Sequence, residues 1–511
     1  YLDYRTPAEK QAIPESLRSL AETNYAVALK LRLQGSPVAR RVEAGGSNTV
    51  RNLLTAALRA MRSSQLPNRV DRKVLEALTI EVEILGEPTD TVPEDLPEAY
   101  IPGLTGLLAR RGRRETRVLP STGYILGLNA DAARRMTIGK LPPSRNDASA
   151  PVRLSLQQSR HYASYPGRPA VWLYRGKRLM PMEAIGEKEL ARAAEAIADF
   201  TVRYQLDSGR FAPPGDRPDL VDHLYATWIL ARYAAARKVS DYNGAIVKAV
   251  SFAAAQRKTG KTGNVYLSTR LPADQLAAAA MYVLTVESAD GIPLSAPAKS
   301  LVEQLRQSIL SRAEEEKIHA RLDGAATASA DIRSIATAAL ALAGQDDAKY
   351  KNAVQVLGKS LIDRIEKDAP DTAQLLWALR VVKYPRQAKL PQTADPLASI
   401  RQNAKQMDEN GGFAAADASP TTANTAHAAV LVLDAFFREG EKSQPVLITA
   451  TTSEQMAARR FCYRMMYKPG EAVFSADPDS WVGAVRTSPE AAKISLYSQA
   501  AVLEALLGVV D

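Results

Sequence analysis

A repeat in the C-terminal part of the chain constrains the fold more than any other feature of the sequence. From Glu187 onward, a loop that usually contains glycine precedes a helix rich in alanine and leucine, with a period of roughly 50 residues. The loops lie at residues 207–212, 263–266, 322–325, 410–414 and 471–474. The helices are expected to begin near residues 222–223, 274–275, 331–332, 371–372, 424–425 and 494–495, mostly at Asp, Asn or Ser, which cap helix N-termini. Six such helices with their partners predict an all-helical domain over residues 187–511.

The loops also support a family resemblance. Asn410-Gly411-Gly412-Phe413 precedes a helix at residues 425–429, and the last unit pairs residues 481–486 with a helix at 494–500. This pattern resembles an (α/α)6 toroid of the terpenoid cyclase and prenyltransferase class, whose repeats carry Gly-Gly-Phe loops before an inner helix. The resemblance implies a ring of helix pairs around a central cavity.

The N-terminal part mixes helix and strand signals. Apolar residues near helical spacing predict a helix over residues 17–35 and a second over 50–61. Residues 78–85 predict a strand in which Ile80, Val82 and Ile84 face a core while Thr79, Glu81 and Glu83 face away. Residues 106–119 predict a hairpin that turns at Gly112, and residues 170–175 predict a closing strand.

These N-terminal pieces resemble an AMMECR-type domain, an α+β domain. The resemblance rests on residues 78–82, on Gly103 and residues 106–112, and on residues 118–120. The family's cysteine motif before the second helix is replaced here by residues 41–47, which contain no cysteine. The sequence therefore predicts a multidomain chain, α+β followed by all-α: an extension over residues 1–16, an AMMECR-like domain over 17–186 and a toroid over 187–511.

Charge and cysteine content limit the possible partners. The formal net charge is +10, and the densest basic cluster comprises Arg110, Arg111, Arg113, Arg114 and Arg117. No aromatic residues interleave with this cluster, so we interpret it as a solvated hairpin and expect no nucleic-acid partner. The single cysteine, Cys462, excludes a disulfide framework and is expected to be buried in a helix. The partner is expected to be an unknown small molecule, a glycan or a protein.

Two observations concern membranes and targeting. No stretch approaches the ~18 consecutive apolar residues that a membrane-spanning helix requires, so the chain is not expected to span a bilayer. The sequence begins at Tyr1 rather than Met, which is compatible with a removed signal peptide and with export.

Any active site is expected at the mouth of the ring. There the N-termini of the inner helices offer unpaired backbone N–H groups, which favour anions and polar ligand groups. The residues at these helix starts are Asp222, His223, Tyr225, Asp274, Asp331, Arg333, His427, Tyr497 and Gln499. We selected Asp222, His223, Tyr225, His427 and Tyr497 as catalytic candidates; the alternative is that these side chains only cap helices and bridge between them. His161 is expected to be exposed and uninvolved.

The chemistry of the resembled families does not transfer. The strong acid motif of the cyclases has no counterpart, because Asp477-Pro478-Asp479-Ser480 lacks the third acid. The zinc site of the prenyltransferases is also missing, since no His lies within ligand spacing of Cys462. No phosphate-binding glycine loop is present, so neither a cofactor nor a metal is expected.

Two hypotheses remain after these exclusions. The first is a binding protein without activity, motivated by the missing motifs. The alternative is an enzyme, either a lyase, a hydrolase or a cyclase-like protein, that acts on a glycan or another polar substrate in the cavity. The cluster of Asp222, His223 and Tyr225 motivates this alternative, because carboxylate, His and Tyr side chains serve as acid and base in glycan chemistry.

Overall fold

The computed structural model divides the chain into two compact units. It describes residues 18–44, 46–63, 66, 72–112, 114–141, 151–165, 170–174, 177–178, 184–313, 318–323, 329–367, 372–382, 423, 425–427, 430, 445–489 and 491–507. Unit 1 comprises Tyr1–Pro181, Tyr467–Val482 and Pro489–Lys493, and unit 2 comprises Met182–Met466, Gly483–Ser488 and Ile494–Asp511. The chain is therefore a mixture of helix and sheet, with the sheet in the N-terminal part, as the sequence predicts.

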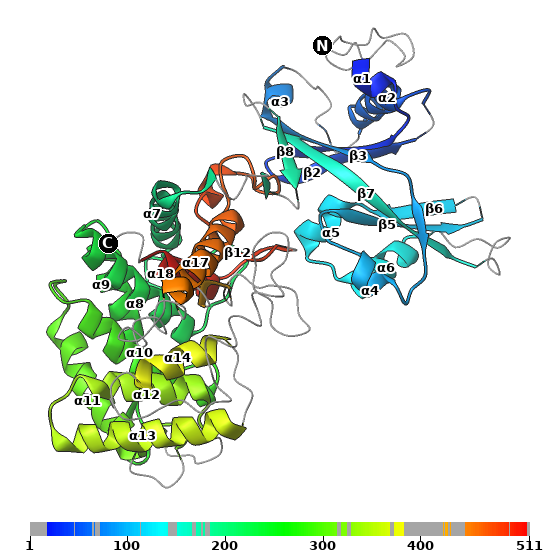
Figure 1. Cartoon of the computed structure of the whole chain (residues 1–511). Coiled ribbons are helices and arrows are strands. Elements are labelled where there is room, and N and C mark those ends of the chain that lie inside the picture. The colour runs from blue at the N-terminus through cyan, green and yellow to red at the C-terminus, as the bar shows by residue number, and fades with distance from the viewer. Residues whose placement is uncertain are drawn as a thin grey trace. The chain divides into compact units, whose positions relative to one another are not determined.

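Unit 1 is built on one antiparallel sheet whose main path runs β2-β1-β3-β7-β5-β6 (Figure 1). The strands are β1 (Ala26–Leu33), β2 (Ser36–Glu43), β3 (Leu78–Leu85), β4 (Thr89–Thr91), β5 (Thr105–Arg111), β6 (Arg114–Val118), β7 (Arg153–Ser164), β8 (Val171–Tyr174) and β9 (Lys177–Arg178). Strand β7 is the longest: its first half pairs with β4 and β5 and its second half with β3 and β8. It therefore joins both parts of the sheet.

Six helices accompany this sheet in the described residues of unit 1. They are α1 (Arg18–Ala21), α2 (Thr49–Ala60), α3 (Arg72–Ala77), α4 (Leu96–Ala99), α5 (Pro120–Leu126) and α6 (Ala130–Gly139). Helix α2 confirms the predicted helix over residues 50–61, and Asn48 caps it by accepting from the backbone N–H of Arg51. Strands β5 and β6 confirm the predicted hairpin, and β8 confirms the predicted closing strand.

The predicted helix over residues 17–35 is wrong, because most of this segment forms β1. Leu29 and Leu31 lie on the β1 face that packs against α2 and β2, whereas Lys30 and Arg32 point to the opposite face of the strand. Gln34 and Gly35 both have positive φ, 50° and 76°, and form a two-residue turn that pairs Leu33 with Ser36. This tight turn commits the segment to a hairpin with β2.

Strand β3 has the predicted bounds, and Val82 of its predicted inner face packs against the core around Leu29 and Leu78. The opposite face differs from the prediction, because Glu81 and Glu83 are each only 1% exposed, whereas Ile80 is 39% exposed. The alternation of apolar and polar residues therefore also points two carboxylates into the interior. Their burial is possible because cationic and hydroxyl side chains of other strands and of α5 surround them.

A C-terminal segment completes unit 1. We call Tyr467–Val482 the C-terminal strap. Its Val473 and Phe474 pack with Ala163, Val171 and Leu173 of strands β7 and β8. The Tyr467 hydroxyl lies 3.1 Å from that of Tyr124 on α5. The core of unit 1 thus includes residues that follow the predicted domain by nearly 300 positions in the sequence.

Unit 2 is mostly helical. Its helices are α7 (Glu187–Arg203), α8 (Leu220–Arg237), α9 (Asn243–Ala254), α10 (Gln275–Ser288), α11 (Ala296–Ala313), α12 (Ile332–Ala343), α13 (Ala348–Lys367), α14 (Thr372–Val382), α17 (Pro445–Met465) and α18 (Leu496–Leu507). Short strands are β10 (Arg257–Thr259), β11 (Val265–Leu267), β12 (Arg486–Ser488) and β13 (Ala491–Ile494), the last mostly within unit 1. Cys462 is fully buried in α17, as predicted.

The helices that the repeat predicts pack next to one another in order. Helix α18 packs against α8, α8 against α10, α10 against α12, and α12 against α14. Helices α9, α11 and α13 pack on the outside of this series, against α8, α10 and α12 (Figure 1). Alanines make the close approach possible: residues 277–280 of α10 are at most 4% exposed. The Gly-Gly-Phe loop at residues 410–414 lies outside the described residues.

Local sequence explains where these helices begin. Asp331 caps α12 by accepting from the backbone N–H of Ser334, 2.7 Å away. Helix α8 is capped by Asp219 rather than by Asp222, so it begins two residues before the predicted start and Asp222 lies in its first turn. No helix in the described part of the chain is long and apolar enough to cross a membrane.

Candidate active site

The structure brings together most of the candidates that the sequence selects. Asp222, His223 and Tyr225 lie in the first turns of α8, Arg333 lies in the first turn of α12, and Tyr497 lies in the first turn of α18. His427 is in a helical stretch, residues 425–427, and its Nε2 lies 2.8 Å from the Tyr497 hydroxyl. We call this group the helix-mouth cluster: Asp222, Tyr225, Asp274, Arg333, His427 and Tyr497.

Asp222 is the carboxyl group of the cluster that is best suited to donate a proton. Its side chain is 26% exposed, and its Oδ1 lies 4.0 Å from Nη2 of Arg333. Burial and the nearby Asp219 raise the pKa of Asp222 to about 7, against the opposing effect of Arg333. A carboxylic acid with such a pKa is partly protonated at neutral pH and can donate a proton.

Asp274 is a second carboxyl group in the same electrostatic neighbourhood. It directly precedes α10, and burial together with Asp219 raises its pKa. Its Oδ2 is buried and has no hydrogen-bond partner in the part of the chain that the structure describes. Asp274 in turn contributes to the raised pKa of Asp222. The charge of Asp274 therefore disfavours the charged form of Asp222.

Arg333, Tyr497 and His427 form a connected side of the cluster. The Arg333 guanidinium lies over the Tyr497 ring, 5.4 Å from its centroid. The Tyr497 hydroxyl and His427 share the hydrogen bond described above. His427 is fully buried, and this burial lowers its pKa to about 4, so the ring is neutral at pH 7. Its Nδ1 has no partner among the described residues.

Below the cluster lies a charged network that the sequence analysis missed. Glu504 of α18 accepts from the Tyr225 hydroxyl at 2.6 Å and pairs with Arg380 at 2.5 Å and Arg232 at 3.0 Å. Burial raises the pKa of Glu504, but Arg380 and Arg232 lower it by more than burial raises it, so the pKa lies below its ordinary value. The Arg380 guanidinium also lies 4.7 Å from the centroid of the Trp377 ring. Tyr225 is thereby fixed in place.

A spacing rule could have found part of this network. Asp222, Tyr225 and Arg232 are three and seven residues apart on α8, and Tyr497 and Glu504 are seven apart on α18. Such spacings place side chains on one helix face. Arg380 comes from α14, and no local signal in the sequence pairs it with Glu504.

His223 is engaged by the backbone. Its Nδ1 accepts from the N–H of Phe211 at 3.3 Å, and its Nε2 donates to the carbonyl of Ala249 at 3.1 Å. Burial lowers its pKa to about 4, which matches a neutral ring with one donor and one acceptor. The two ring nitrogens thus hold the loop at Phe211 and helix α9 against α8, and both are occupied by the backbone.

A cavity of about 510 Å³ lies beside the N-terminus of α8. Such a volume is typical of ligand-binding pockets. The lining residues are Arg210, Ala212, Asp216, Arg217, Pro218, Asp219, Leu220, Phe252, Gln256, Ser268 and Arg270. We call it the α8 pocket; Asp219 is its link to Asp222, since its carboxylate accepts from the Asp222 N–H at 2.8 Å.

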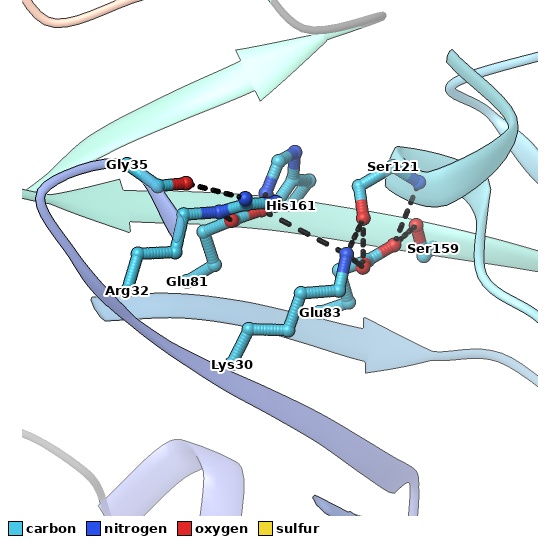
Figure 2. Close-up of polar contacts among 8 residues, drawn as sticks. All are labelled: Lys30, Arg32, Gly35, Glu81, Glu83, Ser121, Ser159 and His161. Carbon is cyan, nitrogen blue, oxygen red and sulfur yellow. Dashed lines mark hydrogen bonds and ion pairs between the residues drawn. The ribbon is translucent and has the colours of Figure 1, made fainter. Parts of the chain in front are cut away.

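Unit 1 contains a separate buried polar network, shown in Figure 2. Lys30 and Arg32 of β1 meet Glu81 and Glu83 of β3, with His161 of β7 beside them. Each of these five residues is at most 6% exposed. The expectation that His161 is exposed and uninvolved is therefore wrong: its Nε2 lies 3.0 Å from Oε2 of Glu81.

Every carboxylate of the unit 1 network has several partners. Glu81 is contacted by Arg32 and His161, and Glu83 accepts from the backbone N–H and the hydroxyl of Ser121. Burial raises the pKa of Glu81 and of Glu83. Lys30 and His161 lower both pKa values, Ser121 also lowers that of Glu83, and these effects outweigh burial, so both pKa values lie below the ordinary one. Because these charges are paired and buried, the network is a structural element of the sheet.

No group of three or more His, Cys, Asp or Glu side chains suited to a metal occurs among the described residues. The helix-mouth cluster instead combines two carboxyl groups, a guanidinium, a neutral imidazole and a phenol. This set can transfer protons and bind hydroxyl groups, which is the equipment that glycan-cleaving enzymes use.

The solved structures that are similar to this chain include an uncharacterized protein and glycoside hydrolases. No protein-family model matches it, and neither does any curated protein sequence. An uncharacterized protein from Pyrococcus horikoshii is 17% identical, with a TM-score of 0.28, over 34% of this chain and 92% of that one. A family 76 glycoside hydrolase from Bacteroides thetaiotaomicron is 9% identical, with a TM-score of 0.45, over 84% of this chain and 96% of that one. A possible GH105 family member from Klebsiella pneumoniae is 12% identical, with a TM-score of 0.41, over 65% and 96% of the two chains.

These comparisons correct the first functional hypothesis. A binding protein without activity was expected, whereas the similar structures named above include a family 76 glycoside hydrolase and a possible GH105 family member. Neither of these two hydrolases belongs to the terpenoid cyclase or prenyltransferase class. At such low identities and TM-scores, the reaction has to be inferred from the site itself.

Proposed function

We propose that unit 2 is a glycan-processing enzyme, a glycoside hydrolase that acts at the helix-mouth cluster with Asp222 as the general acid. The observation that carries the proposal is the partly exposed Asp222 carboxyl, whose pKa is about 7, among further carboxyl groups. Enzymes that cleave glycosidic bonds use two carboxyl groups whose environments assign them different roles.

In this reaction Asp222 donates its proton to the glycosidic oxygen as the bond to the anomeric carbon breaks. Asp274 is the second carboxyl group, because its Oδ2 is not engaged by another described residue. Arg333 lowers the pKa of Asp274 against the effects of burial and Asp219, which favours the ionised form of Asp274. The ionised carboxylate then acts on the anomeric carbon, directly or through a water molecule.

The other residues of the cluster have positioning roles in this proposal. Arg333 stabilises the carboxylate that Asp222 becomes after proton transfer. The hydroxyl of Tyr497 offers a donor or acceptor to sugar hydroxyl groups, and the buried, neutral His427 orients it through their hydrogen bond. Tyr225 is fully buried and held by Glu504, and its ring supports that of the partly exposed Tyr497, with ring centroids 5.6 Å apart. Aromatic faces pack well against the apolar faces of sugar rings.

The fold assignments belong to the same proposal. We propose that the helices of residues 187–511 close into an (α/α)6 toroid, in support of which α18, α8, α10, α12 and α14 pack in series. We also propose an AMMECR-like domain over residues 17–186 after an extension over 1–16. The hairpin at residues 105–118 and the strand at 78–85 support it.

The test is release of reducing ends from a panel of α- and β-linked oligosaccharides and polysaccharides. The wild-type chain should cleave at least one member, and Asp222→Asn should lower kcat by about a thousandfold or more, since general acid catalysis contributes about 10²–10⁴. The matched control is Asp346→Asn, a fully exposed carboxylate far along the chain from the cluster. Equal activity of Asp222→Asn and wild type would refute the assignment.

A further inference from the structure

The α8 pocket is bordered by more positive than negative charge. Arg210, Arg217 and Arg270 line it together with Asp216 and Asp219. None of the three guanidinium groups forms an ion pair with a carboxylate among the described residues. Arg210 is held in position by a hydrogen bond from its Nη2 to the carbonyl of Pro218, 2.7 Å away, and this neutral partner leaves its charge uncompensated.

The two aspartates of the pocket are occupied by backbone donors. Asp216 accepts from the N–H of Leu496 at 2.7 Å and from the N–H of Arg217 at 2.8 Å. Asp219 accepts from the N–H of Asp222 in its role as the helix cap. These carboxylates are thereby fixed to the backbone of α8, of α18 and of the loop that precedes α8. The arginines are therefore the groups of the pocket that have donors left for a ligand.

The remaining lining suits a sugar. Phe252 has a half-buried aromatic ring, on which the apolar face of a pyranose can pack. Gln256 and Ser268 are also half-buried and provide hydrogen-bonding groups for hydroxyls. The volume of about 510 Å³ accommodates one or two sugar rings.

We propose that the α8 pocket is a subsite for an anionic sugar, so that the substrate of this enzyme is an acidic glycan bearing carboxylate or sulfate groups. Arginine forms two parallel hydrogen bonds with either oxyanion, which makes it well suited to this recognition. Because Asp219 joins the pocket to Asp222, a sugar in the pocket lies next to the linkage that Asp222 protonates. The inference rests on the proposed function, which identifies the helix-mouth cluster as the active site. It adds that the substrate carries negative charge.

Binding is measured by calorimetry on the full chain carrying Asp222→Asn, so that the ligand is not cleaved. The probes are three oligosaccharides of equal length: a uronic acid oligomer, a sulfated neutral oligomer and an unmodified neutral oligomer. At least one acidic probe should bind about tenfold or more tightly than the neutral one, with an affinity that falls as salt rises. The acidic probe that binds identifies the source of the oxyanion.

The variants are Arg217→Gln with Arg270→Gln, two exposed positions whose replacement leaves the core intact. The pair should lower the affinity for the acidic probe by about tenfold or more and remove its salt dependence. Arg237→Gln, an exposed arginine in the last turn of α8, is the control and should change neither. Equal binding of neutral and acidic probes, or no effect of the paired variant, overturns the inference.

The experiments distinguish failure of the anionic-sugar subsite from failure of the proposed function. If wild type cleaves neutral glycans through Asp222 and binds no acidic probe preferentially, the subsite is refuted and the enzyme stands. If acidic probes bind in an arginine-dependent manner and no glycan is cleaved, the subsite stands and the hydrolase is refuted.

Discussion

At the scale of single residues, the proton on Asp222 is controlled mainly by burial and Asp219 and is opposed by Arg333. Replacing Arg333 by Gln removes a positive neighbour that lowers the pKa of Asp222, so that pKa should rise above about 7. Carbon NMR of the carboxyl groups, with Asp222→Asn to assign the signal, measures it. Arg237→Gln should leave the signal in place, and an unchanged or lower pKa in Arg333→Gln would contradict the assigned electrostatics.

This shift also fixes the direction of the pH profile. A general acid must be protonated, so activity should be lost as pH rises through the pKa of Asp222. In Arg333→Gln the alkaline limb of kcat/KM should move to higher pH together with the NMR pKa, and separate movement of the two would show that another group limits the rate.

A second residue-scale prediction concerns Lys30 in the unit 1 network. Lys30 contacts Glu81 and Glu83 from one buried ammonium group. Lys30→Met keeps the stem but leaves two buried carboxylates short of a cation, which should cost about 3–5 kcal/mol of unfolding free energy. Hydrogen exchange of β1 and β3 peptides measures the loss within unit 1. Lys73→Met, at an exposed site on α3, is the matched control and should cost little.

At the scale of elements, β3 makes the stability of unit 1 depend on pH. The pKa values of Glu81 and Glu83 are lower in the fold than the roughly 4.3 of an unfolded chain. The unfolded state therefore binds more protons in acid, and the stabilisation present above about pH 5 is lost as pH falls toward the folded pKa values. Exchange of β3 amides, corrected for intrinsic rates, should accelerate between pH 5 and pH 3. Unchanged protection would show that the carboxylates are not ionised in the fold.

The turn between β1 and β2 is the second element with a testable role. Gly35 has φ +76°, and a Cβ at this position would lie 2.4 Å from the carbonyl carbon of Ser475 in the C-terminal strap. Gly35→Ala should cost more than the ~1–2 kcal/mol of the backbone conformation alone. Gly215→Ala is the matched control, because Gly215 has φ +75° and open space around its Cβ. Faster exchange in strap peptides of Gly35→Ala identifies the contact, and equal costs of the two variants would argue against it.

These elements show which parts of the fold the sequence could predict. Helix α2 and the β5–β6 hairpin follow from local periodicity and a glycine turn, so they were found. The predicted helix over residues 17–35 is wrong because the apolar residues of β1 fit both spacings, and only the Gln34–Gly35 turn separates the two. The prediction for β3 misses the burial of Glu81 and Glu83, because the cations that permit it come from β1, which the local pattern does not reveal.

The candidate site divides in the same way. Asp222, Arg333 and Tyr497 could be selected because each lies near a helix start that the repeat marks. Glu504 and Arg232 follow Tyr497 and Tyr225 by seven residues, so spacing could mark them, but their pairing and the part of Arg380 could not be predicted, since they depend on three helices that are far apart in the sequence. His223 shows that a place at a helix start is not enough to select a catalytic residue. It lies beside Asp222, but the backbone occupies both of its ring nitrogens.

At the scale of the whole molecule, unit 1 is discontinuous in sequence. Ala163, Val171 and Leu173 of its sheet pack with Val473 and Phe474 of the C-terminal strap. A fragment ending at residue 181 lacks these partners and would expose part of its core to water, at a cost of about 25 cal/mol per Å² of apolar surface. We therefore expect the fragment to be less stable than unit 1 in the full chain and to bind a dye specific for exposed apolar surface.

The strap supplied as a separate peptide tests this dependence directly. A peptide of residues 467–482 should bind the fragment, suppress dye binding and restore protection of β7 and β8 amides, because it replaces the missing contacts with Val171 and Leu173. A peptide in which Val473 and Phe474 are replaced by Ser is the control and should bind much more weakly, since it keeps the backbone and loses the apolar contacts. If the fragment alone protects β7 and β8 as well as the full chain does, the strap is dispensable and unit 1 folds from its N-terminal residues. If only the unmodified peptide restores protection, unit 1 cannot complete its core until the last part of the chain has been made.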